Sequence, residues 1–262
     1  MGRRSGRMSG LPENGPDLNR LARDRFERPL PKRFYKTVAV EEGEGGYRLT
    51  LDGRPVRTPL KNRLDMPSRA LADAVAGEWD AQGETIDPAA MPLTRLANTA
   101  LDRVAPDPGR IVGEIADYAG TDLLCYRADA PDGLVERQNA VWDPLLSWGA
   151  RAIGARFVAT VGIVHQPQPD ASLQAVRDHL MARDAFTLTS IHNATTLTGS
   201  AIVALALEAG EIAPDEAWAA AHVDEDWQIG LWGRDAEAEA RRAARQVEFD
   251  AAARLLALLA EG

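Results

Sequence analysis

The spacing of apolar residues changes along this chain from every second position to every third or fourth, and this change restricts the fold class more than any other feature. Residues 34–59 alternate apolar and polar side chains in three short runs, FYKTVAV, YRLTLDG and RPVRTP. Glycine-rich turns, GEGG at 43–46 and DG at 52–53, separate the runs, which is typical of an antiparallel meander. From residue 67 onward apolar residues recur every three or four positions, as in amphipathic helices. The sequence therefore predicts an α+β protein, with a small N-terminal antiparallel β/α domain followed by a C-terminal helical bundle.

This pattern also predicts where the domains and elements begin and end. We expect a disordered basic arm at 1–31, an N-terminal α/β domain at 32–120 and a helical domain at 121–262. Short extended pieces are expected at 123–127 and 157–164. Helices are predicted at 67–82, 92–104, 108–119, 133–153, 171–183, 186–209, 214–232 and 235–260.

The charge distribution excludes some classes of partner. The net charge is −9, yet the first 36 residues contain more Lys and Arg than Asp and Glu, so the body of the protein is acidic. An acidic body argues against a groove that follows nucleic-acid phosphates, and the basic tail lacks the interleaved aromatic residues of single-strand binders. The arginine-rich start could also belong to an organelle-targeting segment, although its acidic residues and prolines disfavour that alternative.

The cysteine content and the hydropathy indicate a compartment. No apolar run approaches the roughly 20 residues that cross a bilayer, so we do not expect an integral membrane protein. Cys125 is the only cysteine, which excludes an intramolecular disulfide and suits a reducing compartment.

Motifs for catalysis, cofactors and metals are absent from the sequence. The histidines (165, 179, 192 and 222) are scattered, and no HExxH or CxxC spacing occurs. Cys125 lies in an apolar setting without a basic neighbour, and the glycine-rich GEGGY at 43–47 lacks the helix and lysine of a phosphate loop. We therefore expect no catalytic residue, cofactor, metal or small-molecule substrate.

One segment, WAAAHVDEDWQIGLWGRDAEAEARR at 218–242, combines three tryptophans with a cluster of carboxylates. Aromatic anchors beside charge are typical of protein-binding surfaces. If one helix ran from 214 to 232, Trp218, His222, Glu225, Ile229 and Trp232 would share a face and Val223, Trp227 and Leu231 an adjacent one. We take Glu225, Asp226, Trp227 and Trp232 as candidate partner-binding residues. The alternative is a small-molecule enzyme that uses the clustered carboxylates, which would need a concave pocket and a carboxylate with a perturbed pKa.

Four segments in the same order resemble the Atp12 family of assembly chaperones for the F1 sector of ATP synthase. They are KRFYKTVAVEEGEGGYRLTLDGRPVRTP (32–59), EWD (78–80) with LTRLANTALD (93–102), TDLLCYR (121–127) with WDPLLSW (142–148), and WQIGLWG (227–233). The resemblance implies that the helical part is an orthogonal bundle, and it implies no ATP hydrolysis.

The resemblance also implies a function and a site. Members of the family bind the free α subunit of F1 and protect it from aggregation until the β subunit replaces the chaperone. The family's acidic partner-binding residue follows the WG motif, where this sequence offers Glu237 first, then Asp235 and Glu239. The family occurs in mitochondria and alphaproteobacteria; because nearly all basic residues here are arginine, we expect the bacterial cytoplasm, or the mitochondrial matrix if the source is eukaryotic.

Overall fold

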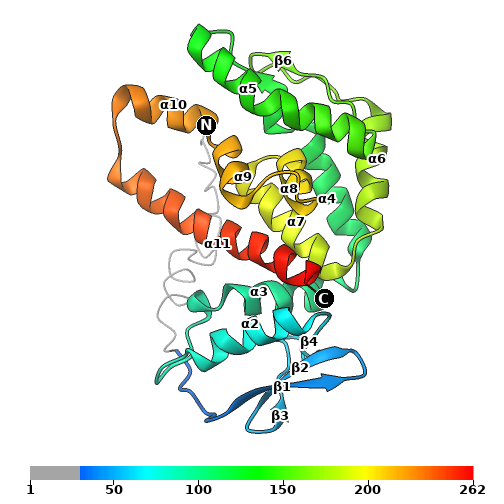
Figure 1. The fold of residues 1–262 in the computed structure, drawn as a ribbon, viewed down its shortest axis with the longest axis vertical. Helices are drawn as coiled ribbons and strands as arrows, with labels where there is room; N and C mark the ends of the chain where they lie inside the picture. The colour runs from blue at the N-terminus through cyan, green and yellow to red at the C-terminus, as the bar shows by residue number, and fades with distance from the viewer. Residues whose placement is uncertain (1–29, 262) are drawn as a thin grey trace, which may run out of the picture.

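The structure, a computed structural model, describes residues 30–261, and the predicted disordered arm lies almost entirely outside these residues. The strands β1–β4 and the helices α2 and α3 gather at one end of the molecule, and the other helices, with a two-stranded pair, form the larger remainder (Figure 1). This arrangement confirms the α+β fold class, with a small antiparallel unit followed by a helical one.

The N-terminal sheet forms where the sequence alternates. β1 (Val38–Gly43) and β2 (Gly46–Leu51) pair antiparallel, and β3 (Arg54–Pro55) and β4 (Asp65–Met66) both pair with β2. The turn between β1 and β2 requires a glycine at its end. Gly46 has a φ of 114°, and a β-carbon there would lie 2.3 Å from the carbonyl oxygen of Met66.

α2 packs on this sheet and α3 packs on α2 (Figure 1), and a single carboxylate connects the two helices. α2 (Arg69–Asp80) begins at the N-cap Ser68, and α3 (Pro92–Thr99) continues into a π-helical turn at 100–104. The Glu78 side chain of α2 accepts hydrogen bonds from the backbone N–H groups of Leu93 (2.7 Å) and Thr94 (2.8 Å). Since α3 has no N-cap side chain of its own, Glu78 satisfies its free donors and fixes the angle between the helices.

The helical unit surrounds an apolar core. Trp142 is fully buried there, and its indole N–H donates to the carbonyl of Ala220 at 2.8 Å. The two short strands β5 (Tyr126–Arg127) and β6 (Thr160–Val161) form a parallel pair. The helices are α4 (Pro108–Gly120), α5 (Asp132–Trp148), α6 (Asp170–Met181), α7 (Ala185–Thr198), α8 (Ala201–Glu208), α9 (Pro214–Ala221), α10 (Val223–Trp232) and α11 (Ala236–Ala260).

Two predicted helices are interrupted, and both predictions were wrong at the break. The helix expected at 186–209 ends at Gly199, which adopts a φ of 72°, and Ser200 caps the next helix by accepting from Val203 N–H at 3.0 Å. The helix expected at 214–232 ends at His222, whose φ of −120° is not helical. Trp218 and Trp232 therefore lie on two helices, α9 and α10, and not on the single helix that was predicted.

The last helix joins the two units. On α11, Phe249 and Ala253 pack into the core of the helical unit, whereas Ala252 and Leu255 pack into the core of the β-containing unit. The side chains of α4 also belong to the helical core. We therefore propose that the division between the units lies near residue 105 instead of 120, with α11 shared by both.

Candidate partner-binding site

Helices α10 and α11 diverge from a short connection at the edge of the molecule (Figure 1). Gly233 ends α10 with a φ of 86°, a conformation that an L side chain rarely adopts. Asp235 then caps α11, because its carboxylate accepts a hydrogen bond from the backbone N–H of Ala238 at 2.8 Å. The WG motif therefore builds a sharp corner, and the acidic residues after it enter a new helix.

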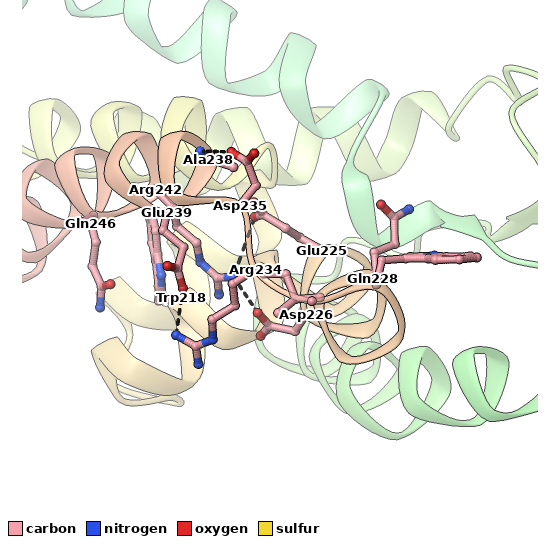
Figure 2. Close-up of a pocket in the computed structure, with 14 residues that line it drawn as sticks. Trp218, Glu225, Asp226, Gln228, Arg234, Asp235, Ala238, Glu239, Arg242 and Gln246 are labelled. Atoms are coloured by element: carbon pink, nitrogen blue, oxygen red, sulfur yellow. Dashed lines mark hydrogen bonds and ion pairs between the residues drawn. The ribbon is translucent and has the colours of Figure 1, made fainter.

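A pocket of about 660 Å³ lies in the angle between these helices. Its lining comes mainly from α10, the corner and the first half of α11, with Trp218 of α9 contributing from behind (Figure 2). The lining residues are Trp218, Glu225, Asp226, Gln228, Ile229, Trp232, Gly233, Arg234, Asp235, Ala238, Glu239, Arg242, Ala243 and Gln246. The pocket thus combines aromatic, acidic and basic side chains.

Trp232 is the most unusual residue of this surface. Its side chain is 86% exposed, and the adjacent Leu231 is 60% exposed. By contrast Trp142, Trp148 and Trp218 are buried, as large aromatic residues usually are. A tryptophan left in water at the mouth of a pocket is a mark of a surface that a partner covers.

Arginines neutralise much of the acidic cluster. Arg242 of α11 lies 2.5 Å from a carboxylate oxygen of Asp226 and 3.8 Å from one of Glu225, so it connects α11 to α10. The hydrogen bond with Asp226 raises the pKa of Arg242. Arg234 at the corner pairs with Glu239 at 2.7 Å. Figure 2 shows these charged groups gathered around the pocket. The carboxylates therefore form a paired network instead of an unscreened acidic patch.

The predicted site residues divide into groups in the structure. Glu225, Asp226, Trp232, Asp235 and Glu239 all line the pocket, whereas Glu237 and Trp227 do not. The lining also includes residues that the sequence interpretation did not select, above all the two arginines at 234 and 242. The i,i+4 spacing gave no signal for them, because the residue four positions from each toward the other is Ala238; only the high arginine content of GRDAEAEARR pointed to this segment.

Glu237 is not among the residues that line the pocket, and it pairs with Arg241 one turn further along α11. Its side chain is 84% exposed. The position is therefore accessible to a partner, and its own ion pair contributes little to the fold because it is in water.

Trp227 has a structural environment. Its ring lies against Gly133 in the first turn of α5, where a β-carbon would come within 2.8 Å of Cη2. The side chain is half-buried and attaches α10 to α5. Trp227 thus positions the helix that presents Trp232.

The wall behind the pocket is a stack of buried rings. Trp218 lies 4.1 Å from His222 and 5.2 Å from Phe249, measured between ring centroids. Burial lowers the pKa of His222, and one of its ring nitrogens lies 2.7 Å from the carbonyl oxygen of Trp218. This stack holds the break between α9 and α10 in a fixed geometry.

Other reactive side chains lie outside this region. Cys125 is buried, and desolvation raises the pKa of its thiol to about 12. His192 instead pairs with Glu114 at 3.0 Å. Between residues 30 and 261, no group of three or more His, Cys, Asp or Glu side chains is placed to hold a metal ion. In the same range no helix has both the length and the apolar character needed to cross a membrane.

Comparisons with known proteins agree with this architecture. The family model described as ATP12 chaperone protein matches residues 32–150. The crystal structure of Atp12 from Paracoccus denitrificans is 44% identical with a TM-score of 0.83, over 87% of this chain and 98% of that one. An aspartate-to-lysine mutant of the same protein is 43% identical, with the same TM-score and coverage.

Two further relatives extend the likeness. A crystal structure of an Agrobacterium tumefaciens protein is 46% identical with a TM-score of 0.85, over 94% of this chain and 92% of that one. The mitochondrial atp12 protein of Schizosaccharomyces pombe is 24% identical over 221 residues, which are 78% of this chain and 76% of the relative. Because identities above 40% extend over nearly the whole length of the Paracoccus protein, the chain belongs to the ATP12 chaperone family.

Proposed function

We propose that this protein is an assembly chaperone for the F1 sector of ATP synthase, which binds the free α subunit and prevents its aggregation until the β subunit replaces it. Membership of the ATP12 chaperone family supports the chaperone role. The proposal places the protein where F1 is assembled, in the bacterial cytoplasm or, for a eukaryotic member, in the mitochondrial matrix.

The observation that carries the proposal is the exposure of Trp232 at the mouth of the pocket between α10 and α11. A subunit that awaits its neighbour exposes an apolar face, and that face aggregates unless another protein covers it. Trp232 and Leu231 provide a rigid apolar anchor for such a face. Trp227, which packs on Gly133, keeps the anchor in place.

The charged residues suit a temporary partner. Glu225, Asp226, Asp235 and Glu239 line the pocket together with Trp232, Glu237 lies exposed beside it on α11, and most of these carboxylates already pair with arginines. The basic groups of a partner can replace those arginines in the ion pairs. This exchange orients the partner and speeds its association, but it adds little net affinity. Modest affinity is what a chaperone needs, because the assembled interface must replace it.

The test follows the aggregation of free α subunit by light scattering. The Trp232→Ala variant should lose most of its protection, because truncation of an aromatic anchor typically weakens binding by about 2 kcal/mol or more. Its melting temperature should stay that of the wild type, since the side chain is 86% exposed. Leu60→Ala, which removes a 56% exposed side chain from the β-containing unit, is the matched control and should protect fully. Full protection by Trp232→Ala would place the binding surface elsewhere.

No observation favours the enzyme alternative. It requires a reactive carboxylate in a concave pocket, and the carboxylate with the largest raised pKa, Asp122 at about 6, has no exposed surface. Asp122 instead accepts hydrogen bonds from the backbone N–H groups of Leu124 (3.1 Å) and Ile202 (3.1 Å), so it caps the start of α8. Its location in the core excludes contact with a substrate.

A further inference from the structure

A second pocket, of about 540 Å³, lies on the β-containing unit and has no part in the site described above. Its floor consists of the buried side chains of Tyr35, Leu51 and Val56. Phe34 and Trp79 form its aromatic walls, and Arg54, Pro55 and Arg57 from the β3 region complete the lining with Asp52. In Figure 1 the strands β1 and β3 lie at the end of the molecule away from α10.

Three aromatic rings form a continuous row along this groove. The centroids of Phe34 and Tyr35 are 5.4 Å apart with the rings almost perpendicular, and those of Tyr35 and Trp79 are 5.7 Å apart. Phe34 is 73% exposed although its neighbour Tyr35 is buried. A large exposed aromatic residue next to an apolar floor indicates a surface that gains free energy when an apolar group covers it.

Two lining side chains have donors without a partner in the described residues, and only that of Arg54 is accessible to a ligand. The indole N–H of Trp79 is buried and has no hydrogen-bond partner in the described part of the chain. Arg54 is exposed on β3 and forms no ion pair within residues 30–261. The tyrosine hydroxyl of the row is already used, because Tyr35 donates to the carbonyl of Trp79 at 2.6 Å.

The only carboxylate in the lining, Asp52, is also already used. Its oxygens accept hydrogen bonds from the backbone N–H groups of Lys36 and Thr37 and from the Thr37 hydroxyl, at 2.9–3.3 Å. These hydrogen bonds, with the Thr37 N–H first, hold the pKa of Asp52 below its usual range. The groove therefore offers aromatic surface and the exposed positive charge of Arg54, and its one carboxylate is already hydrogen-bonded.

We propose that this groove is a second protein-binding surface, which takes an extended polypeptide segment in which a carboxylate side chain is flanked by apolar residues. The apolar side chains contact the aromatic row, and the carboxylate pairs with Arg54. Charge complementarity disfavours the chain's own first 29 residues as the occupant, since their basic residues outnumber their acidic ones. The inference does not depend on which protein the chaperone protects, so it can hold whether or not the proposal about the α subunit is correct.

The test measures fluorescence anisotropy with two labelled hexapeptides. In one, glutamate alternates with leucine and phenylalanine; in the other, lysine replaces glutamate. We expect the full-length protein to bind the glutamate peptide and to bind the lysine peptide at least about tenfold more weakly, because electrostatic complementarity rejects the wrong charge. Equal binding of the two peptides, or binding of neither, would overturn the proposal.

Variants locate the binding surface. Arg54→Glu and Phe34→Ala should each weaken the glutamate peptide at least about fivefold, and both alter exposed side chains. Arg137→Glu, which reverses an exposed arginine on α5, and Trp232→Ala, at the other pocket, should bind as the wild type does. Unfolding curves must overlay for all four. If Trp232→Ala removes binding while Arg54→Glu and Phe34→Ala do not, the peptide occupies the α10–α11 pocket and the inference fails, whatever the outcome with α subunit.

Discussion

The ring of Trp227 on α10 fills the space that a side chain at Gly133 on α5 would need: a β-carbon there would lie 2.8 Å from Trp227 Cη2 and 3.4 Å from Cζ3. This contact sets the position of α10 against α5, and with it the position of Trp232 at the end of the same helix. Glycine at 133 is therefore a packing requirement and not a conformational one.

Gly133→Ala should destabilise the protein by about 1–3 kcal/mol, the usual cost of an extra methyl group in a filled space. Urea denaturation measures the change. Gly77→Ala is the matched control, because Gly77 is also helical but a β-carbon there meets nothing within 4 Å. The control should gain about 0.5–1 kcal/mol from helix propensity. Equal effects of the two substitutions would show that Trp227 does not pack on Gly133.

The sequence was sufficient to predict the fold class, because two-residue alternation and helical periodicity are local signals. The turn at 43–46 and a helix start close to Ser68 followed from residue types alone. The breaks at Gly199 and His222 were missed because apolar residues continue on both sides of each. At Gly199 a left-handed glycine followed by the N-cap Ser200 ends the helix, a signal that the sequence contains, whereas the break at His222 depends on a buried ring stack that only tertiary packing reveals.

The candidate site was predictable in composition and not in geometry. The sequence indicated that tryptophan and acidic residues would gather after 218, and the pocket contains most of them. It could not distinguish Trp227, which packs on α5, from Trp232, which faces solvent, because the two share α10. Nor could it show that Arg242 reaches back to Asp226, since that pair joins two helices across a sharp corner.

Substitution of Trp79 should affect stability first. The Trp79 ring packs against the ring of Tyr35, and the guanidinium of Arg33 lies over that same Tyr35 ring. Trp79→Arg therefore removes aromatic packing and places a second guanidinium close to that of Arg33. We expect a loss of about 2–4 kcal/mol and reduced soluble yield. Thermal unfolding measures the loss, with Phe34→Ala as the control at an exposed ring of the same row. An unchanged melting temperature for Trp79→Arg would contradict the packing role.

Cys125 should be inert in the folded protein. Its side chain is 1% exposed, and burial raises the pKa of the thiol to about 12, so very little thiolate exists at pH 8. A thiol reagent such as DTNB should label the native protein only as fast as local unfolding exposes Cys125. It should label the protein at once in 6 M guanidinium chloride. Rapid labelling without denaturant would mean that Cys125 is accessible.

Asp122 should make stability depend on pH in a defined direction. Burial raises its pKa to about 6 in the folded protein, against opposing hydrogen bonds from Ser200 and Ile202. The folded state therefore holds the proton more tightly than the unfolded state, whose carboxyl titrates near 4. The resulting stabilisation is complete below about pH 4 and is lost as the pH rises through about 6.

Other carboxylates titrate in the same range, so the measurement compares wild type with Asp122→Asn. The free energy of unfolding of the variant, minus that of wild type, should rise between pH 4 and 7 and then level off, because only the wild type loses the contribution of Asp122. A difference that stays constant with pH would show that the pKa of Asp122 is the same in the folded and unfolded states.

The acidic residues near the corner should differ in what their reversal does. Glu237 is 84% exposed, and its only ion pair within the described residues is with Arg241 on the same helix, so Glu237→Lys should change stability by about 0.5 kcal/mol or less. Asp226 connects α10 to Arg242 of α11, so Asp226→Lys places two cations together and should both destabilise the corner and displace Trp232.

If Glu237 meets a basic group of the α subunit, Glu237→Lys should lower the association rate, and the loss of rate should shrink as the salt concentration rises. Stopped-flow association at two salt concentrations, beside unfolding curves and Glu42→Lys on β1 as a charge-matched control, distinguishes the two effects. If Glu237→Lys and the control associate at the same rate at low salt, Glu237 does not contact a basic group of the partner. The carboxylates that line the pocket are then the remaining candidates for that contact.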